Sequence, residues 1–143
     1  TSSSSSRSTS CGAAAPAPSF ADVNYDNGYF GYVEAAVRAG ILMPKVAGEK
    51  LNPDELVTNE ELALLTARAM GYATVINMKN TISNGFTDAA KIGADYGNAV
   101  GLLAGLEVLS NQGEFKPQDQ VTRANVAKVL ALATQKAQGR YYY

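Results

Sequence analysis

Two stretches of the chain carry apolar residues at intervals of three or four positions, the spacing of one helix face. They are Leu62, Leu65 and Ala69 in the first stretch, and Val126, Val129, Leu130 and Ala133 in the second. Thr58 and Glu61 precede the first stretch at capping-box spacing, in which the hydroxyl accepts the Glu61 N–H and the carboxylate reaches back. Thr122 and Asn125 repeat that arrangement, with a weaker reciprocal bond. Glycines end both predicted helices, Gly71 in the first and Gly139 in the second.

Each of these helices follows another predicted helix, so the chain contains two copies of one helix–loop–helix unit. The earlier helices are expected over Asp26–Gly40 and Asp95–Leu109, with Asp26, Asn27 and Asp95 as candidate N-caps. Matching landmarks occur in the same order in both copies: Phe20-Ala21-Asp22-Val23 and Phe86-Thr87-Asp88-Ala89, Gly40-Ile41-Leu42 and Glu107-Val108-Leu109, Leu51-Asn52-Pro53 and Phe115-Lys116-Pro117. The pattern predicts an all-α fold of tandem repeats packed as a small helical bundle. Repeat 1 spans residues 20–72, a connector spans 73–85, and repeat 2 spans 86–138.

The two ends of the chain differ from the repeats in composition. Residues 1–19 are rich in Ser, Thr, Ala and Pro, with Arg7 as their only charge, and we expect them to be disordered alone. This arm has three interpretations: a wall-spanning linker, a remnant of a targeting segment, or a segment that orders on a partner. Its composition also fits an organelle transit peptide. The tyrosine-rich tail, residues 139–143, is by default a frayed terminus, with anchoring in a partner's groove as the alternative.

Composition excludes several classes of function. With 12 basic and 13 acidic residues the net charge is -1, and without a basic stripe we expect no nucleic-acid binding. The chain has no histidine and a single cysteine, Cys11, which removes the usual zinc sites and nucleophile–histidine pairs. We therefore expect no enzyme activity, metal or cofactor, and interpret Cys11 as an idle residue, a free thiol, an intermolecular bridge or a lipidation point. No apolar run approaches the roughly 20 residues that span a membrane.

The ordered landmarks resemble the repeat of the S-layer homology family over about residues 20–133. That repeat has a Phe-x-Asp opening, an aromatic-led helix ending in Gly-Ile-Ile, a Phe-x-Pro segment, and Thr-Arg-Ala-Glu at the start of its second helix. The resemblance implies a noncatalytic module that anchors proteins to peptidoglycan-linked wall polymers, usually through three repeats in a pseudo-threefold bundle. Because this chain carries two, a third repeat would have to come from self-association or from elsewhere.

The resemblance also suggests binding residues, since the arginine and glutamate of Thr-Arg-Ala-Glu are most tied to the ligand. Arg123 keeps the arginine, which Asn59 replaces in the other copy, while Glu61 keeps the glutamate. A guanidinium can bind the carboxylate of an anionic or pyruvylated sugar bidentately, which asparagine cannot. The candidate glycan- or partner-binding residues are Arg123, Thr122, Asn125, Glu61, Tyr29 and Tyr96. Structural interpretations compete: helix caps for Thr122 and Glu61, half-buried core for the tyrosines, and a solvated helix start for Arg123.

Two noncatalytic functions remain. In the first, which we favour, the chain is a cell-envelope anchoring module of a bacterium and binds peptidoglycan-linked wall polysaccharide. In the second, the repeats have lost glycan binding and form a structural protein–protein subunit of a larger assembly. The transit-like arm would place that assembly in an organelle such as a plastid.

Overall fold

The computed structural model describes residues 17–46, 48–79, 82–109 and 113–137. The predictions for residues 1–16, including Cys11, and for Gly139 and the tyrosine tail lie outside the described residues. The elements in chain order are α1 (Phe30–Arg38), β1 (Leu56–Thr58), α2 (Asn59–Ala69), α3 (Ala73–Ile76), the 3₁₀ helix η1 (Ala89–Lys91), α4 (Ala94–Gly105), β2 (Gln120–Thr122) and α5 (Arg123–Ala137). The mainly helical character is confirmed, although the all-α class omits a small sheet. In the described ranges, every helix is too short or too polar to span a membrane.

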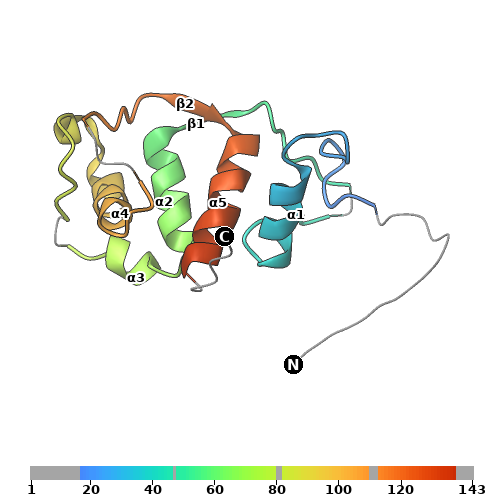
Figure 1. The fold of residues 1–143 in the computed structure, drawn as a ribbon, viewed down its shortest axis with the longest axis horizontal. Coiled ribbons are helices and arrows are strands. Elements are labelled where there is room, and N and C mark those ends of the chain that lie inside the picture. Colours follow the sequence, from blue (N-terminus) through green and yellow to red (C-terminus); the bar gives the residue numbers. More distant parts are fainter. Residues whose placement is uncertain (1–16, 47, 80–81, 110–112, 138–143) are drawn as a thin grey trace.

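The four longer helices lie side by side in the order α4, α2, α5, α1 (Figure 1). In this row the first helix of each repeat packs on the second helix of the other repeat, α1 on α5 and α4 on α2. The central helices α2 and α5 contact each other. The two repeats therefore interlock, because each alanine-rich helix pair packs against helices of the other repeat.

A two-stranded antiparallel sheet also joins the repeats, which corrects the all-α prediction. β1 and β2 run across the ends of the central helices (Figure 1), with Val57 opposite Val121 at the centre of the pairing. The ladder continues past the strands, because the Arg123 N–H donates to the Glu55 carbonyl at 2.9 Å and the Asn59 N–H donates to the Asp119 carbonyl at 2.8 Å. Strands of three residues are too short to give an alternating pattern, so the sequence did not indicate them.

The predicted caps of the second helices are confirmed. The Thr58 hydroxyl accepts the Glu61 N–H at 3.4 Å, and the Thr122 hydroxyl accepts the Asn125 N–H at 3.4 Å. The reciprocal half of the capping box is not among the hydrogen bonds of the described residues. Instead, the Glu61 carboxylate accepts the Tyr96 hydroxyl of α4 at 3.3 Å. A side chain that was predicted to close its own helix end thus links two helices.

The predicted start is wrong by four residues for the first helix of repeat 1 and by one residue for that of repeat 2. α1 begins at Phe30 rather than Asp26, because the preceding residues form turns in which the Asn27 carboxamide oxygen accepts the Tyr29 N–H at 2.8 Å. α4 begins at Ala94, so Asp95 lies within the first turn and is not the N-cap. The negative charge of Asp95 in the first turn still interacts favourably with the positive end of the helix dipole.

Three helices end in the same left-handed arrangement. Gly40, Gly71 and Glu107 have φ of 83°, 94° and 65°, and follow α1, α2 and α4 respectively. After the first and last of these, the N–H groups of Ile41 and Val108 donate to carbonyls five residues back, each at 2.9 Å. This is the Schellman arrangement, for which glycine is favoured. The first helices therefore stop earlier than predicted, and Glu107 occupies a glycine position.

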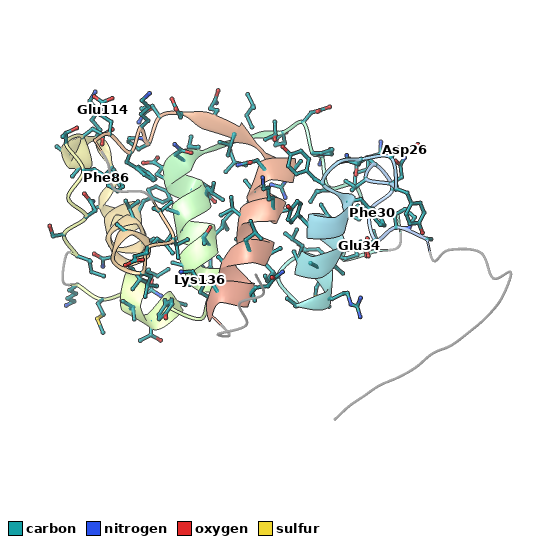
Figure 2. The ribbon with its side chains drawn as sticks, in the orientation of Figure 1. Asp26, Phe30, Glu34, Phe86, Glu114 and Lys136 are labelled. Carbon is teal, nitrogen blue, oxygen red and sulfur yellow. The ribbon has the colours of Figure 1, made fainter. Side chains whose placement is uncertain are left out.

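The core consists of one cluster of apolar residues toward each end of the row and a third cluster at its centre. The α1–α5 group contains Phe20, Val23, Val33, Leu51 and Ala127. The α2–α4 group contains Ala63, Ala67, Ile76, Phe86, Ile92, Ala99, Val100, Leu103, Ala104 and Phe115. Leu62, Val126 and Leu130 fill the centre. Phe86 and Phe30 mark the α4 and α1 ends of the row (Figure 2).

An aspartate ties each repeat's opening to its Leu-Asn-Pro or Phe-Lys-Pro segment. The Asp22 carboxylate accepts two backbone N–H groups, from Leu51 and Asn52, each at 2.8 Å. Asp88 accepts those of Phe115 and Lys116 at 2.9 and 2.8 Å. Burial opposes ionisation of Asp88, but these backbone hydrogen bonds and the charge of nearby Lys91 hold its pKa below the ordinary value.

Candidate binding pocket

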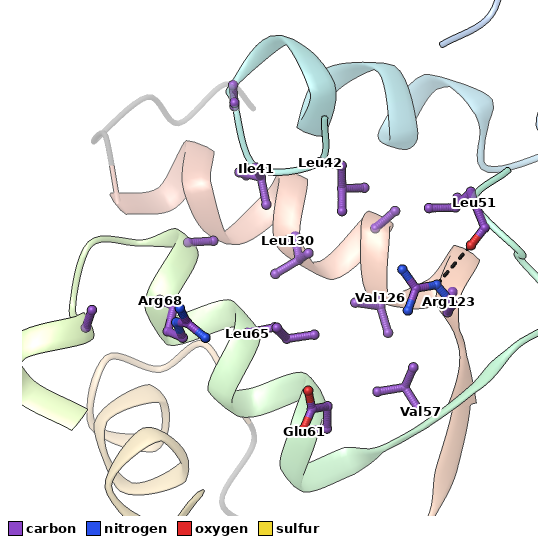
Figure 3. A pocket seen from close by; sticks show the side chains of 15 residues that line it. Ile41, Leu42, Leu51, Val57, Glu61, Leu65, Arg68, Arg123, Val126 and Leu130 are labelled. Atoms are coloured by element: carbon purple, nitrogen blue, oxygen red, sulfur yellow. Dashed lines mark hydrogen bonds between the residues drawn. The ribbon is translucent and has the colours of Figure 1, made fainter. Parts of the chain in front are cut away.

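A pocket of about 650 Å³ lies between α2, α5 and the loop that follows α1 (Figure 3). Its apolar lining includes Ile41, Leu42, Leu65, Val126 and Leu130. Among the described residues that line it, the ionisable side chains are those of Arg123, Arg68 and Glu61. We call it the Arg123 pocket.

Arg123 is oriented by the protein and keeps most of its donors. Its Nε donates to the Leu51 carbonyl at 2.9 Å (Figure 3), which joins the start of α5 to repeat 1. A guanidinium carries five N–H donors, so this bond leaves those of the two terminal amino groups. Arg123 stands at the start of α5, where the helix dipole disfavours a cation by roughly 0.3–1 kcal/mol. The Leu51 contact offsets part of this cost.

Arg68 provides a second guanidinium in the same pocket, and it was not among the residues predicted from the sequence. It lies two turns after Glu61 on α2, roughly 10 Å along the helix. Figure 3 shows Arg68 and Arg123 at opposite ends of the apolar lining. Among the described residues no hydrogen bond or ion pair involves the exposed Arg68 side chain. Its spacing of seven from Glu61 was the available signal, because residues seven apart share a helix face.

Glu61 lies on the pocket wall and connects it to α4. Its carboxylate accepts the Tyr96 hydroxyl, and the negative charge of Glu61 raises the pKa of that hydroxyl. Tyr96 itself does not line the pocket, so it reaches the pocket only through Glu61. The lining of this pocket thus contains a hydrogen-bond acceptor that the Tyr96 hydroxyl orients, in addition to the two arginines.

The remaining candidate residues lie elsewhere. Tyr29 is half-buried and packs against the α1–α5 core group, as the competing core interpretation expected. Thr122 caps α5, and the N–H of Asn125 is the group that it caps. The structure therefore brings Arg123 and Glu61 together in one pocket, but does not place Tyr29, Thr122 or Asn125 in its wall.

A smaller pocket of about 190 Å³ lies on the other side of the central helices. Asn59 lines it, together with Leu62, Ala63, Thr66, Val108, Leu109, Glu114, Phe115 and Val129. We call it the Asn59 pocket. Its lining matches that of the Arg123 pocket by repeat position, with Asn59 in the place of the arginine.

The groups that line the Arg123 pocket can bind an anionic ligand. Its lining provides cationic donors, one carboxylate acceptor and an apolar surface, but no hydroxyl, thiol or imidazole among the described residues. Guanidinium groups bind carboxylates and phosphates through paired charge-assisted hydrogen bonds. The described residues also contain no cluster of three acidic, histidine or cysteine side chains that could hold a metal ion. The arrangement suits an anionic ligand with an apolar face.

Comparison with known proteins adds an independent observation. The chain matches the family model described as S-layer homology domain over residues 19–63 and 85–127. Over 113 residues, or 78% of this chain, it is 28% identical to exoglucanase XynX of Acetivibrio thermocellus, and the match covers 10% of that protein. It is also 28% identical over 113 residues to an amylopullulanase of Thermoanaerobacterium thermosulfurigenes, covering 78% of this chain and 6% of that protein. The chain thus spans a tenth or less of these relatives. No solved structure matches it.

Proposed function

We propose, from the premise that this chain belongs to the S-layer homology family, that it holds wall polysaccharide in the Arg123 pocket and so fixes its protein to the cell envelope. The S-layer homology domain is a noncatalytic anchoring module of bacterial cell-surface proteins. The observation that carries the proposal for this chain is the pair of arginines around an apolar lining. We take the anchor itself to be noncatalytic.

The properties of an acidic wall sugar match the pocket group by group. A carboxylate or phosphate substituent would bind the terminal amino groups of Arg123, which the Leu51 contact leaves available. The apolar face of the sugar ring would lie against Leu65, Val126 and neighbouring aliphatic groups. Glu61 would accept from a sugar hydroxyl, since an ionised carboxylate only accepts hydrogen bonds.

The alternative function, a structural subunit of a larger assembly, would need helix faces that a partner covers. Here the longer helices cover one another within the chain, α1 on α5 and α4 on α2. This packing within one chain also supports a module that acts as a monomer, without self-association to supply a third repeat. Sedimentation of the purified chain as a monomer would support this part of the proposal, and a stable oligomer would contradict it.

The proposal is tested by cosedimentation of the purified chain with wall sacculi, before and after the secondary polymers are stripped from them. We expect binding only to the unstripped sacculi. Arg123→Asn is the informative variant, because asparagine at the matching position of repeat 1 still donates to backbone carbonyls but carries no charge. We expect it to remove most of the binding.

The matched control is Arg38→Ala, which deletes an exposed arginine that does not line the pocket. It should bind like the unaltered chain. Equal binding by Arg123→Asn would exclude Arg123 from the site. Absence of binding to either preparation would reject the wall-polymer function and favour the structural-subunit alternative.

A further inference from the structure

The Arg123 and Asn59 pockets are equivalent by repeat position, but differ in the groups that an anion would need. The second helices provide matching residues: Arg123, Val126, Ala127 and Leu130 in one pocket, and Asn59, Leu62, Ala63 and Thr66 in the other. The segments after the first helices provide Ile41 and Leu42 in one pocket, and Val108 and Leu109 in the other. Leu51 of the first pocket corresponds to Phe115 of the second. The two pockets thus lie at equivalent places in the two repeats.

The amide of Asn59 is fully used inside the protein. Its Nδ2 donates to the Phe115 carbonyl at 3.2 Å and to the Lys116 carbonyl at 2.9 Å. A carboxamide has two N–H donors, so only its oxygen remains, and that oxygen can only accept. Arg123 makes the equivalent contact to Leu51 with Nε alone. The shared contact joins the repeats, and only the arginine has donors left for a ligand.

The rest of the Asn59 pocket opposes an anion as well. The position that matches Arg68 is Leu132, so the second guanidinium is also missing. Glu114 lines this pocket and adds a negative charge. The bulkier Phe115 fills the place of Leu51, and the volume is about 190 Å³ against about 650 Å³. The more negative charge, the missing N–H donors and the smaller volume of the Asn59 pocket all disfavour an anionic ligand.

We infer that this two-repeat module is monovalent: it binds one acidic glycan segment per chain in the Arg123 pocket, while the Asn59 pocket is silent because Asn59 and Leu132 replace the two arginines. This inference rests on the proposed function and adds the number of sites and the residues that set it. A monovalent module gains no avidity from its second repeat. If Asn59 and Leu132 are the reason for the silence, arginine at both positions should create a second site.

The test is isothermal titration calorimetry with oligosaccharides released by mild acid from the sacculi and quantified by their reducing ends. We expect one oligosaccharide per chain, and a loss of affinity of about 10- to 100-fold in Arg123→Asn, as for removal of a charged hydrogen-bond donor. The double variant Asn59→Arg/Leu132→Arg should bind two. Asn77→Arg, an added arginine at an exposed position outside both pockets, should still bind one.

The outcomes separate this inference from the proposed function. Binding of two oligosaccharides by the unaltered chain, with one of them still bound in Arg123→Asn, would overturn monovalency and leave wall binding intact. One site in the double variant, with its fold intact by circular dichroism, would overturn the assignment of silence to Asn59 and Leu132. Absence of binding by every variant would reject the proposed function itself.

Discussion

Replacing Leu103 by alanine tests the interlocked row of helices. Leu103 lies on α4 with 0% of its surface exposed, inside the α2–α4 core group. Leucine-to-alanine changes at such sites cost 2–5 kcal/mol, so we expect a loss of about 3 kcal/mol in the free energy of unfolding. With a urea m-value of about 2 kcal/mol/M, the unfolding midpoint should fall by about 1.5 M. Leu132→Ala is the control, since this leucine is 45% exposed and should change stability by less than about 0.5 kcal/mol.

The assay is urea unfolding followed by far-UV circular dichroism, with hydrogen exchange to locate the effect. Because α4 packs on α2, α2 on α5, and α5 on α1, the destabilisation should be shared along the row. We therefore expect a single transition, and reduced amide protection in α1 as well as in α4 of Leu103→Ala. Two transitions, with α1 and α5 unaffected, would refute the interlocked arrangement. A loss below about 1 kcal/mol would refute the packing argument.

Three further predictions concern helix ends and acid stability. Glu107→Gly should raise the unfolding free energy by about 1 kcal/mol, because φ at this position is 65° and glycine adopts it without strain. Gly40→Ala should lower the unfolding free energy by a similar amount, because φ there is 83°. Urea midpoints that do not move in these variants would contradict this prediction. Thr122→Ala should cost about 1 kcal/mol through loss of the cap, measured the same way. The lowered pKa of Asp88 contributes stability that is present above the unfolded pKa near 4 and is lost as pH falls through the folded value, so Asp88→Asn should flatten the acid dependence of thermal unfolding.

The sequence could predict the parts of the fold that depend on neighbouring residues. The caps at Thr58 and Thr122 and the left-handed stop at Gly71 follow from short spacings, and the structure confirms them. The family was also predictable, because its landmarks recur in order in both copies. The start of α1 at Phe30 was not, because the turns before it satisfy their hydrogen bonds locally and compete with the helix.

Features that depend on pairing between repeats could not be read from one sequence. The three-residue strands gain their hydrogen bonds only from each other, and their residues alone resemble a helix start. Likewise, an apolar helix stripe shows that a face is buried but not which helix covers it. The packing of α1 on α5 therefore had no sequence signal.

The candidate pocket was predictable in part. Arg123 and Glu61 came from the family motif, and the structure places both in the lining of one pocket. Tyr29 and Tyr96 were chosen for their aromatic rings, but half-buried tyrosines serve packing as readily as binding, and neither lines the pocket. Arg68 was missed because a cation in the last turn of a helix has an ordinary explanation in the helix dipole. Its place in the lining of the Arg123 pocket became visible only in the structure.

The most direct test of the central claim, that the Arg123 pocket holds the wall glycan, is NMR chemical-shift mapping with the released oligosaccharides. We expect the largest changes in backbone amide shifts at Ile41, Leu42, Leu51 and Val126, which line this pocket. These changes should disappear in Arg123→Asn. Changes centred on Asn59 and Phe115, or on a surface outside both pockets, would contradict it.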